Sequence, residues 1–274
     1  MIDHSTAVKY TGYNPDNPIT YHPAVGLWTL CFKEVQRFLK VAAQTLIAPL
    51  ITVLLFMVIF SVALGQSVDN IGGVPLLIFL SPGLIMMTVV QNAFANSSSS
   101  LIISKLQGNI VDLVMPPLSP IELVAGMTFG AVTRGVTVGA LIWAVMWLWI
   151  GLVPLYLWFV ITFLVLSSAL LGLLGVLAGL WAEKFDQMAV ITNFIITPLS
   201  FLSGTFYSVK RLPETWYIIS QFNPFFYMID GFRYGFTGQS DANHLVGLLV
   251  LLSVTVVLAV LCVFLVRRGY KIKA

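Results

Sequence analysis

Six long runs of apolar residues restrict the fold of this chain more than any other feature of its sequence. They cover about residues 41–64, 74–98, 121–150, 154–180, 188–206 and 244–266. About 20 apolar residues let a helix cross a hydrocarbon core roughly 30 Å thick, whereas a barrel would show alternating segments of about ten residues. The sequence therefore predicts an all-α membrane protein with six transmembrane helices.

The composition agrees with this fold class. Charged residues make up 9% of the 274 residues and hydrophobic residues 58%, whereas about a quarter of a soluble domain is charged. The two cysteines, Cys31 and Cys262, lie far apart and give no disulfide framework. We expect a polar tail over residues 1–23, one membrane domain over residues 24–270 and a cytoplasmic tail over residues 271–274.

The positions of the basic residues predict the orientation. Six spans put both termini on one side, and that side holds ten lysines and arginines against three on the other. Basic residues are enriched in cytoplasmic loops, so we expect both termini to be cytoplasmic. The ten are Lys9, Lys33, Arg37, Lys40, Lys105, Lys184, Arg267, Arg268, Lys271 and Lys273, and the three are Lys210, Arg211 and Arg233.

Residues 24–40, before the first span, have the pattern of an amphipathic helix. Such a helix lies in the membrane interface with its basic face toward anionic headgroups; the simpler interpretation is an anchor for the first span. The apolar face is Trp28, Phe32, Val35 and Leu39, and the basic face is Lys33, Arg37 and Lys40.

The loop after the second span carries a short apolar stripe formed by Ile110, Leu113 and Val114. A helix here must end before Pro116. A two-turn helix at the mouth of a helix bundle could dock a soluble partner, and the same pattern suits an ordinary surface helix.

Residues 206–236 are unusually aromatic, with 11 aromatic side chains in 31 residues. Pro213 and the pair Asn223-Pro224 are helix-start signals, so we expect two short helices that dip back into the outer leaflet. The alternative is an aromatic belt that anchors the chain at the interface. Asp230 and Arg233 are three residues apart and could pair on one face of a helix.

Small residues and prolines recur inside the spans. The glycines sit at spacings that let helix backbones approach closely, and we interpret them as packing positions: Gly126, Gly130, Gly135, Gly139, Gly172, Gly175 and Gly179. Pro49, Pro82 and Pro198 should kink their spans. Arg134 either faces a cavity in the inner half of the bundle or extends to the headgroups.

Several catalytic classes lack their residues in this sequence. It contains no His-Glu-x-x-His, no Cys-x-x-Cys and no membrane-embedded pair of aspartates, so we expect no metal site and no enzyme activity. The serine run 97–100 has no histidine partner for nucleophilic activation and is interpreted as the polar end of a span. No lysine follows a glycine, so the phosphate-binding loop of ATPases is missing.

Four blocks of sequence resemble one family of membrane proteins. They are PGLIMMTVVQNAFAN at 82–96, NIVDL at 109–113, TPLSFLSGTFYS at 197–208 and NPFFYMIDGFRYGF at 223–236. Together with the six spans they resemble the membrane subunits of type-2 ABC exporters, in particular the YadH-like permeases related to NodJ. The resemblance covers roughly residues 24–270.

This resemblance implies a function and partners. It implies the permease subunit of an ATP-binding cassette exporter in the bacterial inner membrane, a homodimer bound to two copies of a separate ATPase that holds ATP and magnesium. It also implies a path between the protomers, lined by the first, second and fifth spans, and ATPase docking by residues 104–116, with Gly108, Asn109, Ile110, Asp112, Leu113 and Val114 as candidates.

The aromatic segment is then expected to close the outer end of that path at the dimer interface. The candidate gate residues are Phe206, Tyr207, Phe225, Phe226, Tyr227, Asp230 and Arg233. The substrate is left open among drugs, lipids and lipid-linked or modified oligosaccharides. The rival function is that of a membrane scaffold without transport, and no nucleic-acid partner is expected.

Overall fold

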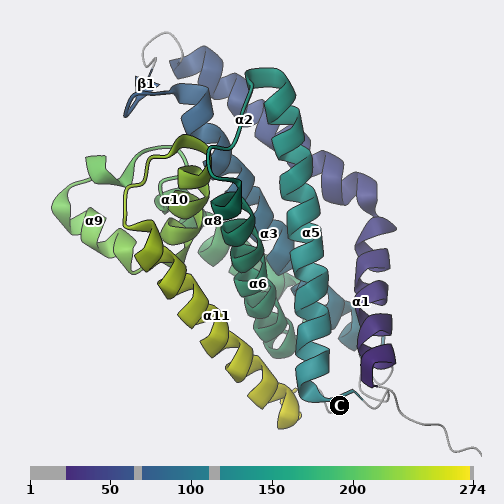
Figure 1. The fold of residues 1–274 in the computed structure, drawn as a ribbon. Coiled ribbons are helices and arrows are strands. Elements are labelled where there is room, and N and C mark those ends of the chain that lie inside the picture. The colour runs from purple at the N-terminus through teal and green to yellow at the C-terminus, as the bar shows by residue number, and fades with distance from the viewer. Residues whose placement is uncertain (1–22, 65–69, 111–117, 272–274) are drawn as a thin grey trace, which may run out of the picture.

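The computed structural model describes residues 23–64, 70–110 and 118–271. Apart from one two-stranded turn, its elements are helices (Figure 1). In chain order they are α1 (Pro23–Leu39), η1 (Ala43–Ile47), α2 (Ala48–Leu64), β1 (Asn70–Ile71), β2 (Val74–Pro75), α3 (Leu76–Leu106), α5 (Pro120–Ile150), α6 (Leu157–Trp181), α7 (Phe185–Ile191), η2 (Thr192–Ile196), α8 (Thr197–Leu202), η3 (Val209–Arg211), α9 (Glu214–Gln221), α10 (Pro224–Thr237) and α11 (His244–Arg267).

Six helical segments of the described residues are long and apolar enough to cross a membrane, which confirms the predicted number of spans. They are Ala43–Ala63, Leu76–Leu106, Pro120–Ile150, Leu157–Trp181, Phe185–Leu202 and His244–Arg267. Two ends differ from the expectation: the second span continues to Leu106 instead of ending near 98, and the fifth ends at Leu202.

The serine run caused the error in the second span. Ser97, Ser98 and Ser100 are buried inside α3 instead of marking its polar end. The Ser98 hydroxyl donates to the Phe94 carbonyl of the preceding turn, and that of Ser97 donates to Met127 on α5. Small hydroxyls that bond to backbone in this way can stay within a span.

Helix α3 is the centre of the bundle, with 83% of its most apolar window buried. It is in contact with α5, α6 and α10. The packing interpretation of the glycines is confirmed, because a Cβ on Gly175 would lie 2.5 Å from the Phe94 carbonyl oxygen and one on Gly172 would lie 2.6 Å from the Ala131 Cβ. The glycines therefore set how closely α3, α5 and α6 approach.

Polar residues fix the ends of the long helices. Ser119 and Glu122 form a capping box at the start of α5, and Gly151, at φ 68°, ends that helix. The side chains of Asn223 and Asn243 accept hydrogen bonds from backbone N–H groups at the starts of α10 and α11. These caps satisfy N–H groups that have no partner within the helix.

Helix α1 lies beside the first half of α5 instead of crossing the end of the bundle (Figure 1). The positions of Gly126 and Gly130 on α5 bring it close, since added Cβ atoms there would meet Leu30 at 2.5 Å and Glu34 at 2.6 Å. Trp28 and Phe32, which the sequence places on one apolar face, are 69% and 53% exposed. The face that meets α5 carries Leu30, Glu34 and Phe38, all buried.

The prolines have different consequences. Helix α3 runs unbroken past Pro82. Pro49 and Pro198 are each the second residue of an α-helix that directly follows a five-residue π-helix, η1 or η2. The π-helices are features that the sequence analysis did not foresee.

Candidate functional site

A cavity of about 790 Å³ lies where the first, second, third and fifth spans meet α1. Polar groups on η1, α2 and α3 line it together with two arginines, Arg37 and Arg134. Its polar side chains include Gln44, Thr45, Thr88, Gln91, Asn92 and Ser99. Ionisable side chains inside an apolar helix bundle are a default indication of function.

Arg134 extends from the middle of α5 into this cavity. Its Nη2 and Nε donate to the Asn92 Oδ1 at 2.9 and 3.3 Å. The two alternatives left open by the sequence were a cavity-facing and a headgroup-facing arginine, and the structure places Arg134 in the cavity.

Arg37 and Glu34 connect α1 to α3 beside the same cavity. The Arg37 Nη2 donates to the Glu34 Oε2 at 2.9 Å and to the Asn96 backbone oxygen at 2.7 Å. The second Glu34 oxygen accepts from the Ser100 hydroxyl at 2.6 Å. Glu34 is fully buried, so Arg37 turns inward and does not belong to a basic face directed at headgroups.

The sequence analysis missed Glu34, Asn92 and Asn96. A usable signal existed: Glu34 and Arg37 have the spacing of neighbours on a helix, and Asn92 and Asn96 share one face of the second span. Amides and a carboxylate in or beside apolar runs are expensive there unless they are paired.

The C-terminal ends of the first and fifth spans meet in a cluster of four phenylalanines. The ring of Phe206 lies 5.0 Å from that of Phe60, 5.9 Å from that of Phe56 and 5.4 Å from that of Phe201. Phe206 therefore joins α2 to the end of α8. Tyr207, its neighbour, donates its hydroxyl to the Leu202 carbonyl at 3.0 Å.

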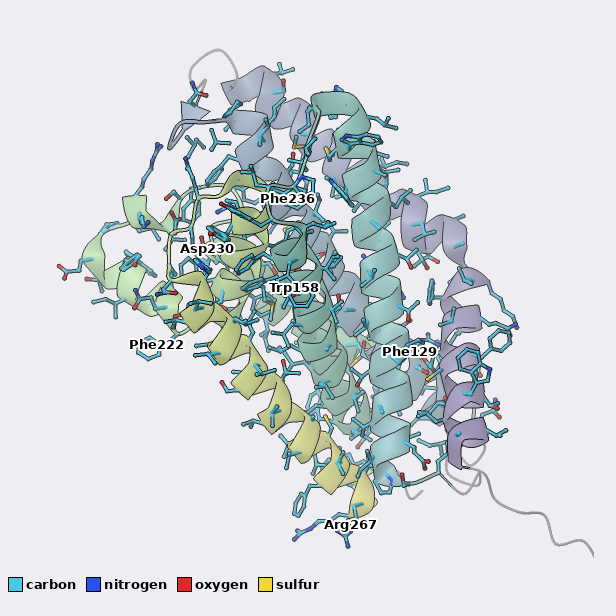
Figure 2. The ribbon with its side chains drawn as sticks, in the orientation of Figure 1. Phe129, Trp158, Phe222, Asp230, Phe236 and Arg267 are labelled. Atoms are coloured by element: carbon cyan, nitrogen blue, oxygen red, sulfur yellow. The ribbon has the colours of Figure 1, made fainter. Side chains whose placement is uncertain are left out.

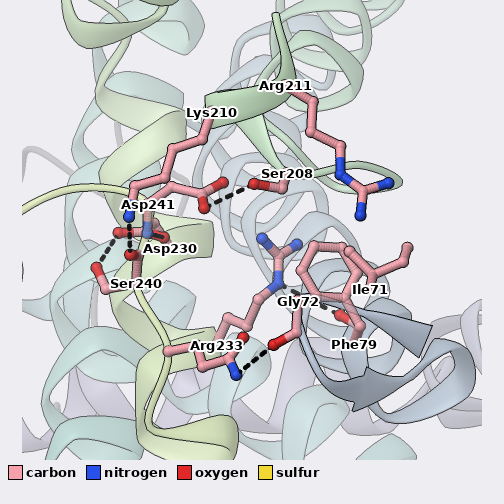
Figure 3. Close-up of a pocket in the computed structure, with 11 residues that line it drawn as sticks. Ile71, Gly72, Phe79, Ser208, Lys210, Arg211, Asp230, Arg233, Ser240 and Asp241 are labelled. Atoms are coloured by element: carbon pink, nitrogen blue, oxygen red, sulfur yellow. Dashed lines mark hydrogen bonds between the residues drawn. The ribbon is translucent and has the colours of Figure 1, made fainter.

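A polar pocket of about 340 Å³ lies between the start of α3, the turn after Gly204 and the end of α10, with Phe79, Ser208 and Arg233 among its lining residues (Figure 3). Arg233 is 3% exposed; its Nη2 donates to the Gly204 carbonyl at 2.5 Å, and its guanidinium lies 4.0 Å from the centre of the Phe79 ring. Asp230 accepts from the Asp241 N–H at 2.7 Å and from that of Ala242. These bonds hold the two turns that flank α9 and α10.

Two expectations for this segment were wrong. Asp230 and Arg233 do not form an ion pair. Asp230 accepts from two backbone N–H groups and from the Ser240 hydroxyl, and Arg233 donates to backbone carbonyls and lies over the Phe79 ring. Phe226 is completely buried, and Phe225 and Tyr227 are 4% and 8% exposed, so these three residues of α10 fill the core and cannot face a second protomer.

Helix α9 is the exposed part of the segment instead. Trp216 is 54% exposed, and Phe222, which follows α9, is 85% exposed and points away from the bundle (Figure 2). The two short helices begin after Pro213 and Asn223, as the sequence predicts.

The docking candidates are only partly described. Asp112, Leu113 and Val114 lie outside the described residues. Gly108 has a φ of 71°, and Asn109 donates its side-chain amide to Gln107 at 3.5 Å. Ile110 is 9% exposed, so it contributes to the interior of the chain and not to a free stripe.

Three groups outside the spans have shifted pKa values. Burial raises the pKa of the Cys31 thiol on α1, and the charge of Glu34 adds to this effect. The hydrogen bond from Lys271 lowers the pKa of Glu183, and the same bond raises the pKa of Lys271. The Lys271 Nζ lies 2.7 Å from the Glu183 Oε1, which joins the end of α11 to the end of α6.

Comparison with known proteins identifies this arrangement. Residues 25–237 match the family model described as ABC-2 type transporter. The chain belongs to this family. The chain is 38% identical over 246 residues to the inner membrane transport permease YadH of Escherichia coli K12, covering 89% of this chain and 96% of YadH. It is 26% identical over 256 residues to nodulation protein J of Rhizobium leguminosarum bv. viciae, covering 89% of this chain and 92% of that protein.

Proposed function

We propose that this chain is the membrane-spanning permease subunit of an ATP-driven exporter. The observation that carries the proposal is the cavity between the first, second and fifth spans, within a domain that belongs to the ABC-2 type transporter family. A path in this position needs a polar inner vestibule and an outer closure. The arginine-lined cavity supplies the first and the Phe206 cluster supplies the second.

The proposed assembly contains two copies of this chain and two copies of a separate ATP-binding subunit. The chain lacks its own phosphate-binding loop, so ATP and magnesium bind to the partner. YadH is named as an inner membrane permease, and the basic residues favour cytoplasmic termini. We therefore place the complex in the bacterial inner membrane with residues 104–116 facing the ATPase.

Co-purification tests the docking step. The chain is expressed with an ATP-binding subunit that co-purifies with the wild type, and Leu113→Asp is compared with Tyr270→Asp. Tyr270 is an exposed aromatic residue, 42% accessible, beside Lys271 at the end of α11. We expect Leu113→Asp to lose the ATPase and Tyr270→Asp to retain it in equal amounts.

Reconstitution tests the transport function itself. The wild-type complex in vesicles should hydrolyse ATP and move an amphiphile across the bilayer only when both subunits are present, and its mass should correspond to two copies of each. A complex that assembles and hydrolyses ATP but moves nothing would favour the rival scaffold function. Retained ATPase pairing in Leu113→Asp would refute docking at residues 108–114.

A further inference from the structure

The charges of the inner cavity are not balanced. Among the described residues that line it, Arg37 and Arg134 are the charged ones, and none of its lining residues is a carboxylate. Glu34 compensates Arg37 from behind the cavity wall. Within the described part of the chain, Arg134 donates its hydrogen bonds to the neutral Asn92, and the charge that acts on it is that of Arg37, which has the same sign.

Arg134 also has donors to spare. A guanidinium carries five N–H donors in a planar fork, and the bonds to Asn92 use the Nε and Nη2 atoms. If Arg134 served only to link α5 to α3, a neutral amide side chain could donate the same hydrogen bond to Asn92 without placing a charge in the bundle. An excess positive charge in a cavity is instead the feature expected of a site for an anion.

We propose that this cavity binds the phosphate group of an anionic amphiphile that enters sideways from the bilayer. The inference deepens the proposed export function, since such an amphiphile would be the transported substrate. Arg134 forms the charged contact with the phosphate, because a guanidinium matches phosphate oxygens in a bidentate manner. Thr45, Gln91 and Ser99 provide hydroxyl and amide groups for the rest of a polar headgroup.

The walls of the cavity suit the other half of such a molecule. Phe38, Met87 and Ile103 line it with apolar surface. Val41 and Phe185 also line it and are each 50% exposed. An acyl chain can therefore remain in the lipid while the headgroup enters. The volume of about 790 Å³ lies within the roughly 300–1,000 Å³ of sites for small molecules.

Binding to the purified full-length chain tests this proposal without the ATPase. Dodecyl phosphate is titrated into the protein in dodecyl maltoside micelles of constant total detergent, and the dissociation constant is obtained from the rise in unfolding temperature. Inorganic phosphate is titrated in parallel. We expect saturable binding of dodecyl phosphate that weakens with salt, and at least tenfold weaker binding of inorganic phosphate.

The variant Arg134→Gln removes the positive charge but keeps the hydrogen bond between α5 and α3, because a glutamine amide can still donate to Asn92. We expect at least tenfold weaker binding of dodecyl phosphate in Arg134→Gln and an intermediate loss in Arg134→Lys, which keeps the charge and loses the fork. Arg267→Gln, which removes an exposed arginine at the end of α11, is the matched control and should bind as the wild type does.

Equal affinities of the wild type, Arg134→Gln and Arg134→Lys would overturn the site, and an equal loss in Arg267→Gln would show general attraction to basic surface instead. Inorganic phosphate that binds as tightly as dodecyl phosphate would refute entry from the bilayer. Should Arg134→Gln not fold, Arg134→Lys decides. Because the ATPase is absent, failure here with intact ATP-dependent export would leave the proposed function standing.

Discussion

Replacing Glu34 with alanine is expected to release α1 from the bundle without unfolding the rest. Glu34 is fully buried and accepts two hydrogen bonds, from Ser100 at 2.6 Å and from Arg37 at 2.9 Å. A hydrogen bond to a charged group contributes about 1.5–3 kcal/mol. Arg37 is 26% exposed and keeps its bonds to Asn96, so the loss on that side is at the lower end.

The net cost of Glu34→Ala is therefore about 3 kcal/mol for the attachment of α1. Because each 1.4 kcal/mol is a factor of ten, the population with α1 detached should rise about a hundredfold. Glu34→Gln keeps the volume and one acceptor oxygen, and we expect about a tenfold rise.

The two cysteines allow this to be measured in a single sample. Cys31 lies on α1 and Cys262 on α11, and both are buried and free. Reaction with a maleimide followed by peptide mass spectrometry gives a rate for each. Detachment of α1 exposes Cys31 alone, whereas global unfolding exposes both thiols.

We expect Glu34→Ala to accelerate labelling of Cys31 about a hundredfold while Cys262 reacts at the wild-type rate. Glu34 also raises the pKa of Cys31 through its charge. Glu34→Ala and Glu34→Gln both remove that charge, so the difference between their labelling rates reports on the attachment of α1 alone. Unchanged labelling of Cys31 in Glu34→Ala, or equal acceleration of both cysteines, would refute the role of Glu34 in attaching α1 to the bundle.

Three further predictions concern the packing, the outer turns and the surface. Gly175→Ala should lower the free energy of unfolding by about 3 kcal/mol, the upper end of the usual range for overpacking, because the new Cβ would lie 2.5 Å from a backbone oxygen of α3. Gly151→Ala, at φ 68° with open space around it, should cost only about 1 kcal/mol; equal costs would contradict the packing argument. Arg233→Met removes the hydrogen bonds to the buried Gly204 and Phe79 carbonyls and should cost about 2–4 kcal/mol in thermal unfolding. An unchanged midpoint would contradict the role of Arg233 in holding these turns. The pKa of Glu183 is lowered and that of Lys271 is raised. Their ion pair therefore stabilises the folded chain at pH values between the two pKa values, and this contribution is lost as the pH falls through the pKa of Glu183 or rises through that of Lys271. Since exposed pairs contribute little, Glu183→Gln should leave the unfolding midpoint at neutral pH unchanged, and a clear drop would refute this.

The six spans could be predicted because the bilayer requires a fixed length of apolar sequence. The faces of α1 could not, because periodicity identifies two faces without saying which one meets protein. In water the apolar residues Trp28 and Phe32 would turn inward; beside lipid they remain exposed, and Glu34 is buried. The partners of Asp230 and Arg233 could not be predicted either. Both residues bond to backbone groups of turns that are distant in the sequence, and residue spacing does not indicate such contacts.

The prolines of the first and fifth spans connect the fold to the cavity. A proline has no N–H and its ring clashes with the carbonyl four residues earlier, and a π-turn moves that carbonyl away. Before Pro198 the wider turn is seen in the Thr197 N–H, which donates to the Thr192 carbonyl five residues back. Pro49 lines the cavity, and Thr197 accepts a bond of 3.5 Å from Gln91, which lines it too.

Bending is easiest where the regular hydrogen-bond ladder is already interrupted. Both interruptions lie in spans that are mostly uncovered, with 11% and 17% of their apolar windows buried, whereas α3 is 83% buried and continuous across Pro82. We therefore expect the cavity to widen by movement of the first and fifth spans at η1 and η2 against a fixed α3. Spin labels on either side of each π-helix would measure this movement under turnover, and a state that bends α3 at Pro82 while η1 and η2 stay unchanged would contradict it.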